Sequence, residues 1–366
     1  MRFDIAVTDF YNAEYVKNGG SHGLKFRTYI KTLHPRNVFR ISRIERSEVR
    51  NVFLEIESDG VVAYGEASPN SYYRETADLA REKLRGLSGK LGNPSVESAE
   101  DIAVLWTDCW RLLAPSRAAQ CALDVALWDL LGKKMGLNVT RLIFDHDPQP
   151  VTSFATIGLS NPCELERKLN ELRTFPRIKI KSGRESDDAI VQSVLAQTNA
   201  LFSVDANCAW DPETVEKRVA ALENPRALFV EQPIPPSNWA RMREILPRCS
   251  LPVIADESCV TPDDIERLPG CFSGFNIKLV KCGGLTPALA MLRRGRELGL
   301  SVMVGCMLES SLLVSAAAVI AQHSDHADLD GAWLLADDPF RGCAFENGVL
   351  CPSNGSGFGV WPAGAL

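Results

Sequence analysis

The chain has 366 residues, 45% of them hydrophobic, so it is long enough to bury a large core as one barrel or two domains. Its formal net charge is -6, with basic residues scattered along the chain, which gives no electrostatic reason to expect nucleic acid or an anionic membrane as a partner. The longest apolar run, near residues 312–321, is too short to span a bilayer.

The amino terminus and the cysteines predict a cytoplasmic protein. The first residues include Asp4 and lack the apolar segment of a signal peptide. The 11 cysteines are an odd number, and none forms a Cys-x-x-Cys pair or a Cys/His spacing that would hold zinc. We therefore expect reduced, mostly buried thiols.

Residues 1 to about 70 alternate apolar and polar positions in several runs, which predicts an antiparallel meander. Two segments interrupt it, the glycine-rich residues 18–23 and residues 65–73, which end in Tyr72 and Tyr73. Each is expected to be a surface connection, with a functional lid as the alternative. From Arg74 to about Gly136 the periodicity is helical, and the small residues of 118–133 predict close helix packing.

After residue 150, short apolar strands alternate with helical segments, which predicts a closed parallel barrel rather than an open doubly wound sheet. No Gly-x-Gly-x-x-Gly follows any strand, which excludes a dinucleotide site of that type. Four predicted helices begin with a capping residue followed by proline: Asn161-Pro162, Asp211-Pro212, Thr261-Pro262 and Thr286-Pro287. The expected strands are 151–157, 177–181, 201–205, 228–231, 253–256, 274–279, 301–305 and 327–330.

Five successive predicted strands carry a charged residue at their carboxyl end, where the chemistry of such a barrel lies. These residues are 24, 26, 25 and 22 positions apart, which is one strand-helix unit each time. The series is Lys181, Asp205, Glu231, Asp256 and Lys278.

Three carboxylates in one barrel mouth repel one another unless a cation lies between them. All-oxygen ligation by Asp205, Glu231 and Asp256 predicts Mg²⁺ or, less selectively, Mn²⁺. For any single acid of the three, a helix cap or a surface charge is the alternative.

Lys181 and Lys278 are predicted to flank this metal, because the second and sixth strands lie across the barrel from each other. A metal that holds a substrate carboxylate stabilises the ene-diolate formed when the adjacent α-proton leaves. One lysine would remove that proton and the other would return one on the opposite face. Lys281 is a competing second base, although it has the opposite strand parity.

Lys179 and Lys181 share one face of their strand because side chains alternate between faces. Desolvation and mutual repulsion favour a neutral amine for at least one of them. Lys181, nearer the carboxyl end, is the predicted base. Lys179 is expected to pair with the surrounding carboxylates and to help keep Lys181 neutral, so that replacing Lys179 with methionine raises the pH at which Lys181 works.

Six segments together resemble the enolase superfamily and, within it, the muconate-lactonizing-enzyme subgroup; they are 122–133, 179–181, 204–207, 230–233, 255–258 and 276–284. A Lys base with Mg²⁺ is a known arrangement of that superfamily. The resemblance implies a modified TIM barrel of the (β/α)7β type with an α+β capping domain, divided as 1–128, 129–339 and 340–366, with both loops closing on the substrate. It also implies the metal and acid/base roles given above.

Other residues narrow the reaction within this subgroup. The mandelate-racemase branch uses a histidine on the seventh strand, which this chain lacks, so no histidine is given a catalytic role. Asp328 and Asp330 point the same way on the eighth strand, and Asp-x-Asp there resembles the dipeptide epimerases, in which it binds the α-ammonium group; an ordinary turn is the alternative. Glu309 matches a family glutamate near the site, but a helix-start acid explains it equally.

The sequence therefore predicts a Mg²⁺-dependent dipeptide epimerase that inverts the α-carbon of the carboxyl-terminal residue by 1,1-proton transfer. Alternatives in the subgroup are an N-acylamino acid racemase, an o-succinylbenzoate synthase and a cycloisomerase. An alternative from another class is a barrel that binds a carboxylate without catalysis, and the presence of both lysines argues against it. The side-chain preference stays open, since a basic residue near 24–27 suits an acidic dipeptide and the tyrosines an apolar one. Relatives are commonly symmetric assemblies, which leaves a homo-oligomer open.

Overall fold

The computed structural model describes residues 24–41, 44–87, 90–91, 94–158, 162–184 and 187–364. The glycine-rich segment 18–23, one of the two predicted lid loops, lies outside the described residues. None of the helices in the described ranges combines the length and the apolar character that crossing a membrane requires.

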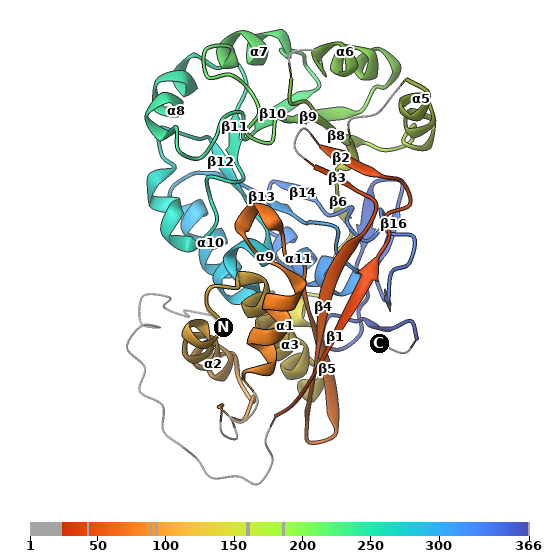
Figure 1. Ribbon diagram of the computed structural model, residues 1–366, viewed down its shortest axis with the longest axis vertical. Helices are drawn as coiled ribbons and strands as arrows, with labels where there is room; N and C mark the ends of the chain where they lie inside the picture. Colours follow the sequence, from red (N-terminus) through yellow and green to blue (C-terminus); the bar gives the residue numbers. More distant parts are fainter. Residues whose placement is uncertain are drawn as a thin grey trace.

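Within the described residues, eight parallel strands pair in chain order from β7 to β14. Phe154 N, next to the first strand, donates to Ala327 O of the last at 2.8 Å, so the sheet nearly closes (Figure 1). This confirms the predicted barrel. The strands are β7 (Ala155–Ile157), β8 (Arg177–Lys181), β9 (Leu201–Asp205), β10 (Ala227–Glu231), β11 (Val253–Ala255), β12 (Gly274–Ile277), β13 (Ser301–Gly305) and β14 (His326–Asp328).

Helices follow the first seven barrel strands and surround the sheet (Figure 1). The described residues after β14 form short strands instead, which agrees with the (β/α)7β expectation. The helices are α5 (Pro162–Glu171), α6 (Asp188–Gln197), α7 (Val215–Ala221), α8 (Trp239–Ile245), η4 (Leu246–Arg248), η5 (Pro262–Arg267), α9 (Leu279–Cys282), α10 (Leu285–Glu297) and α11 (Ser311–Ala321).

The amino-terminal cap packs an antiparallel sheet, ordered β1-β4-β5, against helices. A Cβ at Gly65 would lie 1.8 Å from Ala122 O, so β5 can approach α3 this closely only with glycine there. The close helix packing predicted from small residues is therefore present. The cap elements are β1 (Lys25–Leu33), β2 (Phe39–Ile41), β3 (Ile44–Arg46), β4 (Val49–Ser58), β5 (Val61–Ala67), η2 (Ser71–Tyr73), α1 (Ala77–Arg85), α2 (Ala99–Leu113), α3 (Arg117–Met135) and α4 (Val139–Phe144).

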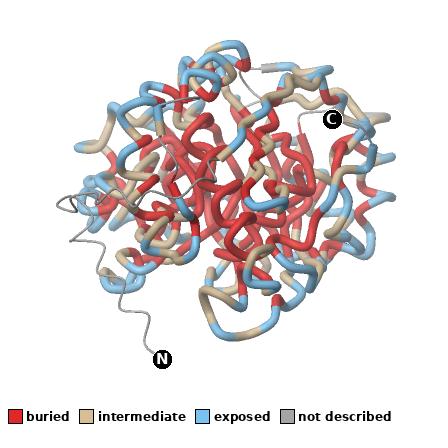
Figure 2. The backbone as a smooth tube through the Cα atoms, turned by 90° about the horizontal axis from the view of Figure 1, so that it is seen from below, coloured by how far each residue is buried: buried red, intermediate tan, exposed pale blue. Residues whose placement is uncertain are grey.

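The carboxyl-terminal segment returns to the cap. The Phe340 ring lies 5.6 Å from that of Phe53 and 5.4 Å from that of Tyr64, centroid to centroid. Val139 N donates to Gly357 O at 2.9 Å. The remaining strands are β6 (Val151–Thr152), β15 (Phe340–Arg341), β16 (Ala344–Glu346), β17 (Val349–Cys351) and β18 (Trp361–Pro362). Figure 2 shows buried residues running through the interior and exposed residues over the outer helices and loops.

Several predicted element bounds are wrong. The strand expected at 151–157 is two strands, because β6 pairs antiparallel with β17 of the tail while β7 joins the barrel. The strand expected at 274–279 ends at Ile277, and the one expected at 327–330 runs from His326 to Asp328. Asp211-Pro212 begins a turn, and α7 starts only at Val215.

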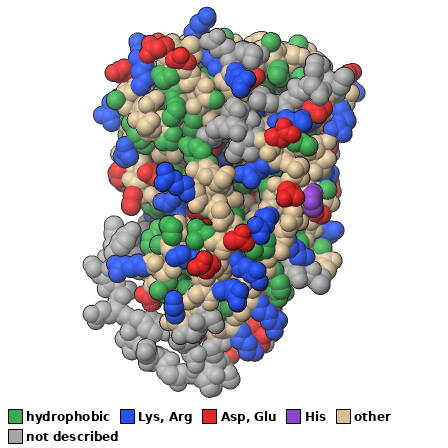
Figure 3. Space-filling model, in the orientation of Figure 1, with side chains coloured by type: hydrophobic (Ala, Val, Ile, Leu, Met, Phe, Trp, Pro, Cys, Tyr) green, Lys and Arg blue, Asp and Glu red, His purple; other side chains and the backbone are tan. Residues whose placement is uncertain are grey.

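Two further sequence expectations concern where helices begin and where the domains divide. Helix α10 starts at Leu285, one residue before the predicted capping residue Thr286. The predicted division between residues 128 and 129 falls inside α3, and the domain limits stay predictions. Basic and acidic side chains are interspersed over the face drawn in Figure 3, as expected from their scatter along the chain.

Candidate active site

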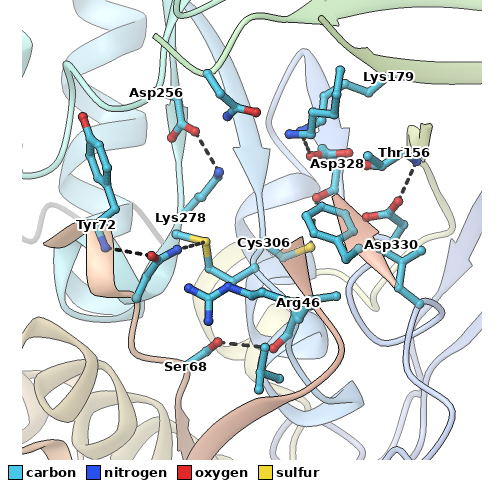
Figure 4. Close-up of a pocket in the computed structure, with 18 of the residues that line it drawn as sticks. Arg46, Ser68, Tyr72, Thr156, Lys179, Asp256, Lys278, Cys306, Asp328 and Asp330 are labelled. Atoms are coloured by element: carbon cyan, nitrogen blue, oxygen red, sulfur yellow. Dashed lines mark hydrogen bonds and ion pairs between the residues drawn. The ribbon is translucent and has the colours of Figure 1, made fainter. Parts of the chain in front are cut away.

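A cavity of about 110 Å³ lies where the carboxyl ends of the barrel strands meet the cap (Figure 4). The barrel lines it with charged side chains, namely Lys179, Lys181, Asp256, Glu257, Lys278, Asp328 and Asp330. The cap lines it with Phe39, Arg46, Val49, Ser68, Pro69, Asn70, Tyr72 and Tyr73. The described part of the second predicted loop therefore borders the cavity.

Asp205 and Asp256 are buried carboxylates, each in contact with a lysine. Lys181 Nζ donates to Asp205 Oδ2 at 2.6 Å, and Lys278 Nζ donates to Asp256 Oδ2 at 2.8 Å. Burial alone would raise the pKa of Asp205, but Lys181 and Lys179 outweigh it and lower that pKa. Burial would also raise the pKa of Asp256, but the charges of Lys278 and Lys281 outweigh it and lower that pKa.

Glu231, at the end of β10, is different because its charge is only weakly compensated. Its Oε1 accepts a hydrogen bond from Asn276 Nδ2 at 2.7 Å, while Oε2 is buried without a hydrogen-bond partner in the described structure. Lys179 Nζ lies 3.5 Å from Oε2. Burial, and next the charge of Asp205, raise the pKa of Glu231 to about 7.

The three carboxylates are oxygen ligands, the type that a hard cation such as Mg²⁺ binds. Among the described residues, no three His, Cys, Asp or Glu side chains group closely enough to hold a metal as they stand, and a lysine forms an ion pair with each of the three carboxylates instead. Nevertheless, carboxylate oxygens are the ligands that Mg²⁺ takes, and Glu231 Oε2 accepts no hydrogen bond from any described residue. The assignment of Asp205, Glu231 and Asp256 as metal ligands stays a prediction.

Lys181 and Lys278 both line the cavity, from strand β8 and from the residue after β12. These are the second and sixth strands of the eight, so they lie across the barrel. Burial would lower the pKa of Lys278, but Asp256 and Glu231 outweigh it and raise that pKa. Lys278 is thus an ammonium group in this state, the form that donates a proton.

Lys281 does not line the cavity and so does not compete as second base. It belongs to α9 rather than to a strand, and it is 2% exposed. Its Nζ lies 2.5 Å from Asp256 Oδ1, 2.6 Å from Asp256 O, 3.0 Å from Cys259 O and 2.9 Å from Asn276 O. It therefore holds Asp256 in place from behind.

Asp328 and Asp330 both line the cavity wall, and only Asp328 contacts Lys179 (Figure 4). Lys179 Nζ donates to Asp328 Oδ2, and Asp328 Oδ1 is buried without a hydrogen bond in the described structure. Asp330 Oδ2 accepts a hydrogen bond from Thr156 N at 2.7 Å. Burial and then the charge of Asp328 raise the pKa of Asp330 to about 7.

Lys179 also lies 3.8 Å from Asp205, so the expected pairing of this lysine with the surrounding carboxylates is present. Burial would lower the pKa of Lys179, but Asp328, Glu231 and Asp205 outweigh it and raise that pKa well above its usual value.

Glu309 is buried but does not line the cavity, whereas Met307 and Leu308 do. Its Oε1 accepts a hydrogen bond from Met307 N at 2.9 Å. Burial and then Glu66 raise the pKa of Glu309 to about 8. Its predicted role at the substrate stays a prediction.

Arg46, from β3 of the cap, was not singled out by the sequence. It lines the cavity (Figure 4) and is half-buried. It also makes a 3.5 Å hydrogen bond to Ser71 Oγ. Within the described residues it forms no ion pair, and burial lowers its pKa. Lys25 and Arg27, which the sequence placed near a lid, pair instead with Glu57 and Glu55. Only the fold brings β3 over the barrel mouth.

Comparison with protein-family models and known proteins gives consistent matches. Residues 27–143 match the amino-terminal domain of the mandelate racemase/muconate lactonizing enzyme family, and residues 164–364 match the enolase carboxyl-terminal domain-like model. An L-Ala-D/L-amino acid epimerase from Flavobacterium johnsoniae is 36% identical over 326 residues, which cover 89% of this chain and 96% of that protein. A hydrophobic dipeptide epimerase from a Flavobacteria bacterium is 33% identical over 350 residues, covering 92% and 98%.

A solved structure adds to these matches. A dipeptide epimerase from Methylococcus capsulatus, crystallised with Mg and the dipeptide L-Arg-D-Lys, superposes with a TM-score of 0.83 at 28% identity. The superposition covers 93% of this chain and 99% of that one.

Proposed function

This chain belongs to the mandelate racemase/muconate lactonizing enzyme family of the enolase superfamily, and from that premise we propose that it is a dipeptide epimerase. It inverts the α-carbon of the carboxyl-terminal residue by 1,1-proton transfer. The family hosts several reactions, so the choice among them rests on residues of this chain.

The Asp328–Asp330 pair carries the choice of substrate. Lys179 contacts Asp328 alone of the two, and within the described residues Asp328 Oδ1 is buried without a hydrogen-bond donor. An unsatisfied buried acceptor is costly, and a substrate ammonium group would satisfy it by a charge-assisted hydrogen bond. N-acyl and cyclic carboxylates bring no such group, so the pair favours a dipeptide with a free amino terminus.

Lys181 and Lys278 supply the proton transfer. They approach the cavity from opposite strands, so one takes the α-proton while the other, as an ammonium group, returns one on the opposite face. Asp205, Glu231 and Asp256 are the residues that would hold Mg²⁺. When bound there, Mg²⁺ supplies charge stabilisation for the substrate carboxylate as the α-proton leaves.

Arg46 sets the preferred side chain. A half-buried guanidinium group that forms no ion pair with the described residues gains from a substrate carboxylate, because that contact offsets the loss of hydration on burial. We therefore infer a preference for an acidic residue at the epimerised position, with Tyr72 and Phe39 packing against the rest of the substrate.

The reaction is tested by incubating the purified protein and Mg²⁺ with mixed L,L-dipeptides in D₂O and measuring the mass of each dipeptide. A gain of one deuterium, with appearance of the L,D-epimer, is expected. No exchange on any dipeptide would rule out the reaction.

The ammonium contact is tested separately with Asp328→Asn. Its kcat/KM should fall by about 100-fold for dipeptides, since a charge-assisted contact is lost. An unchanged rate for dipeptides, or equal activity on their N-acetylated forms, would favour the N-acylamino acid racemase reading.

The side-chain preference is tested by comparing L-Ala-L-Glu with L-Ala-L-Leu. Arg46→Met should lower kcat/KM for the acidic dipeptide by about 10- to 100-fold and leave the apolar one nearly unchanged, since a hydrogen bond to a charged group contributes about 1.5–3 kcal/mol. Arg50→Met is the matched control, because Arg50 pairs with Asp78 outside the cavity. Equal losses on both substrates would contradict the assignment.

A further inference from the structure

We propose that His146 and His323 form a binding site for a transition-metal ion such as Zn²⁺, distinct from the barrel mouth. His146 follows α4, and His323 follows α11, 177 residues later. His146 lines a cavity of about 520 Å³ together with Arg177 and His326, the first residues of β8 and β14. The pair therefore lies at the amino ends of the barrel strands, opposite the candidate active site.

The distance between the two rings matches shared coordination. His146 Nε2 and His323 Nε2 are 3.4 Å apart. Two imidazole nitrogens bound to one tetrahedral zinc at about 2.0–2.1 Å are about 3.3–3.4 Å from each other. A direct hydrogen bond between nitrogens would bring them to about 3 Å, so the observed separation is long for one.

The hydrogen bond of His146 fixes which ring nitrogen faces His323. Its Nδ1 lies 2.9 Å from Asp147 O, and because a carbonyl oxygen only accepts, Nδ1 donates. Metal-binding histidines commonly donate their second ring nitrogen to a carbonyl in this way. The other nitrogen, Nε2, is the one that faces His323.

The two imidazole rings share an aromatic neighbour. The Phe144 ring packs against both imidazoles, 4.1 Å from that of His323 and 6.1 Å from that of His146 between centroids. Since one aromatic ring restrains both partners, little ordering remains to be done when an ion binds.

The donor set selects the kind of ion. Among the described residues, no third His, Cys, Asp or Glu completes the group, and neighbouring Asp147 is bonded to Arg141 at 3.1 Å. Two imidazoles with water in the remaining positions suit Zn²⁺, Cu²⁺ or Ni²⁺, and they do not suit Mg²⁺, which takes oxygen ligands. The bound ion would tie the segment entering the barrel to the end of its last helix.

The test is calorimetric titration of untagged, metal-free protein with ZnCl₂ in saturating MgCl₂. One equivalent of Zn²⁺ per chain should bind, and His146→Ala or His323→Ala should each weaken binding by about tenfold or more, since even an outer-shell change costs that much. Zn²⁺ should also raise the unfolding temperature of the wild type but not of either variant.

His34→Ala is the matched control, because His34 is an exposed histidine that pairs with Asp337 elsewhere. It should leave Zn²⁺ binding unchanged. Absence of saturable Zn²⁺ binding would overturn the proposal. So would binding that survives in the double variant His146→Ala/His323→Ala but is lost in Asp256→Asn, because that result places the ion at the barrel mouth.

Discussion

At the scale of single residues, lysines that look alike in the sequence have different contacts at the barrel mouth. Lys181 and Lys278 reach the cavity from opposite strands, Lys179 lines it as well but contacts three carboxylates, and Lys281 is enclosed behind Asp256. A buried ammonium group is tolerated only where carboxylates and carbonyls surround it, so each position has its own partners.

The two cavity lysines should divide the reaction between them. Lys181→Ala and Lys278→Ala should each abolish epimerisation, with a loss of about 10²–10⁴-fold or more. In D₂O, each variant should still exchange the α-proton of one epimer through the remaining lysine, and the two variants should act on opposite epimers. Mass spectrometry of the separated epimers measures this, and exchange of both epimers by a single variant would contradict the two-base scheme.

Lys281→Met should weaken Mg²⁺ binding by about 10- to 100-fold, because Asp256 loses the group that orients it. Losing a positive charge near the cation acts the other way, but the loss of orientation should outweigh it. Calorimetry of the metal-free protein measures the affinity. Lys278→Met is the control, since it keeps all four contacts of Lys281. Tighter Mg²⁺ binding in Lys281→Met would show that removing the Lys281 charge matters more than the lost orientation of Asp256.

At the scale of elements, α10 depends on a side chain from α3. The residue before α10 is Gly284, which has no capping side chain, and Asp124 takes its place. Thr286 N donates to Asp124 Oδ2 at 2.9 Å, and Thr286 Oγ1 donates to Oδ1 at 2.5 Å. This explains why Thr286-Pro287, which predicted a helix start, lies inside the first turn.

Asp124→Ala should lower the free energy of unfolding by about 1–2 kcal/mol, as loss of a helix cap does. Denaturant unfolding of both proteins measures it. Asp124→Asn is the milder control, because its amide still accepts the Thr286 N hydrogen bond.

The stability of the wild type and that of Asp124→Asn should also depend differently on pH. Burial raises the pKa of Asp124 to about 7, so the folded protein binds this proton more tightly than the unfolded chain. Stability from that proton is complete at low pH and is lost as the pH rises through about 7. Asp124→Asn cannot ionise, so its stability relative to the wild type should rise as the pH increases from about 4 to about 7 and stay constant above that. A difference that stays constant with pH would show that folding does not shift the pKa of this carboxyl group.

At the scale of the whole molecule, the candidate site exists only where the cap meets the barrel. The barrel supplies the charged residues, whereas the cap supplies Arg46, Tyr72 and Tyr73. The tail joins the two, because Phe340 packs against Phe53 of β4.

Mg²⁺ should therefore stabilise the whole fold. An ion that binds the folded protein and not the unfolded chain raises stability by about 2.7 kcal/mol at 100 times its dissociation constant. The unfolding temperature should rise with MgCl₂ and fall on adding EDTA. Asp205→Asn should lose most of this response, whereas Asp211→Asn, in an exposed turn, should keep it. A Mg²⁺ response that is unchanged in Asp205→Asn would contradict the ligand assignment.

The linear sequence predicted the barrel, the series Lys181, Asp205, Glu231, Asp256 and Lys278, and the Asp328–Asp330 pair. It could do so because strand parity and the spacing of strand-helix units are local, periodic properties.

Only the tertiary structure decided which residues meet from distant parts of the chain. It enclosed Lys281 behind Asp256, brought Arg46 from the cap to the barrel mouth, and put Asp124 at the start of α10. Such contacts join residues separated by as many as 162 positions, and no period or local propensity encodes them. They follow from how the layers pack, which depends on the whole chain folding at once.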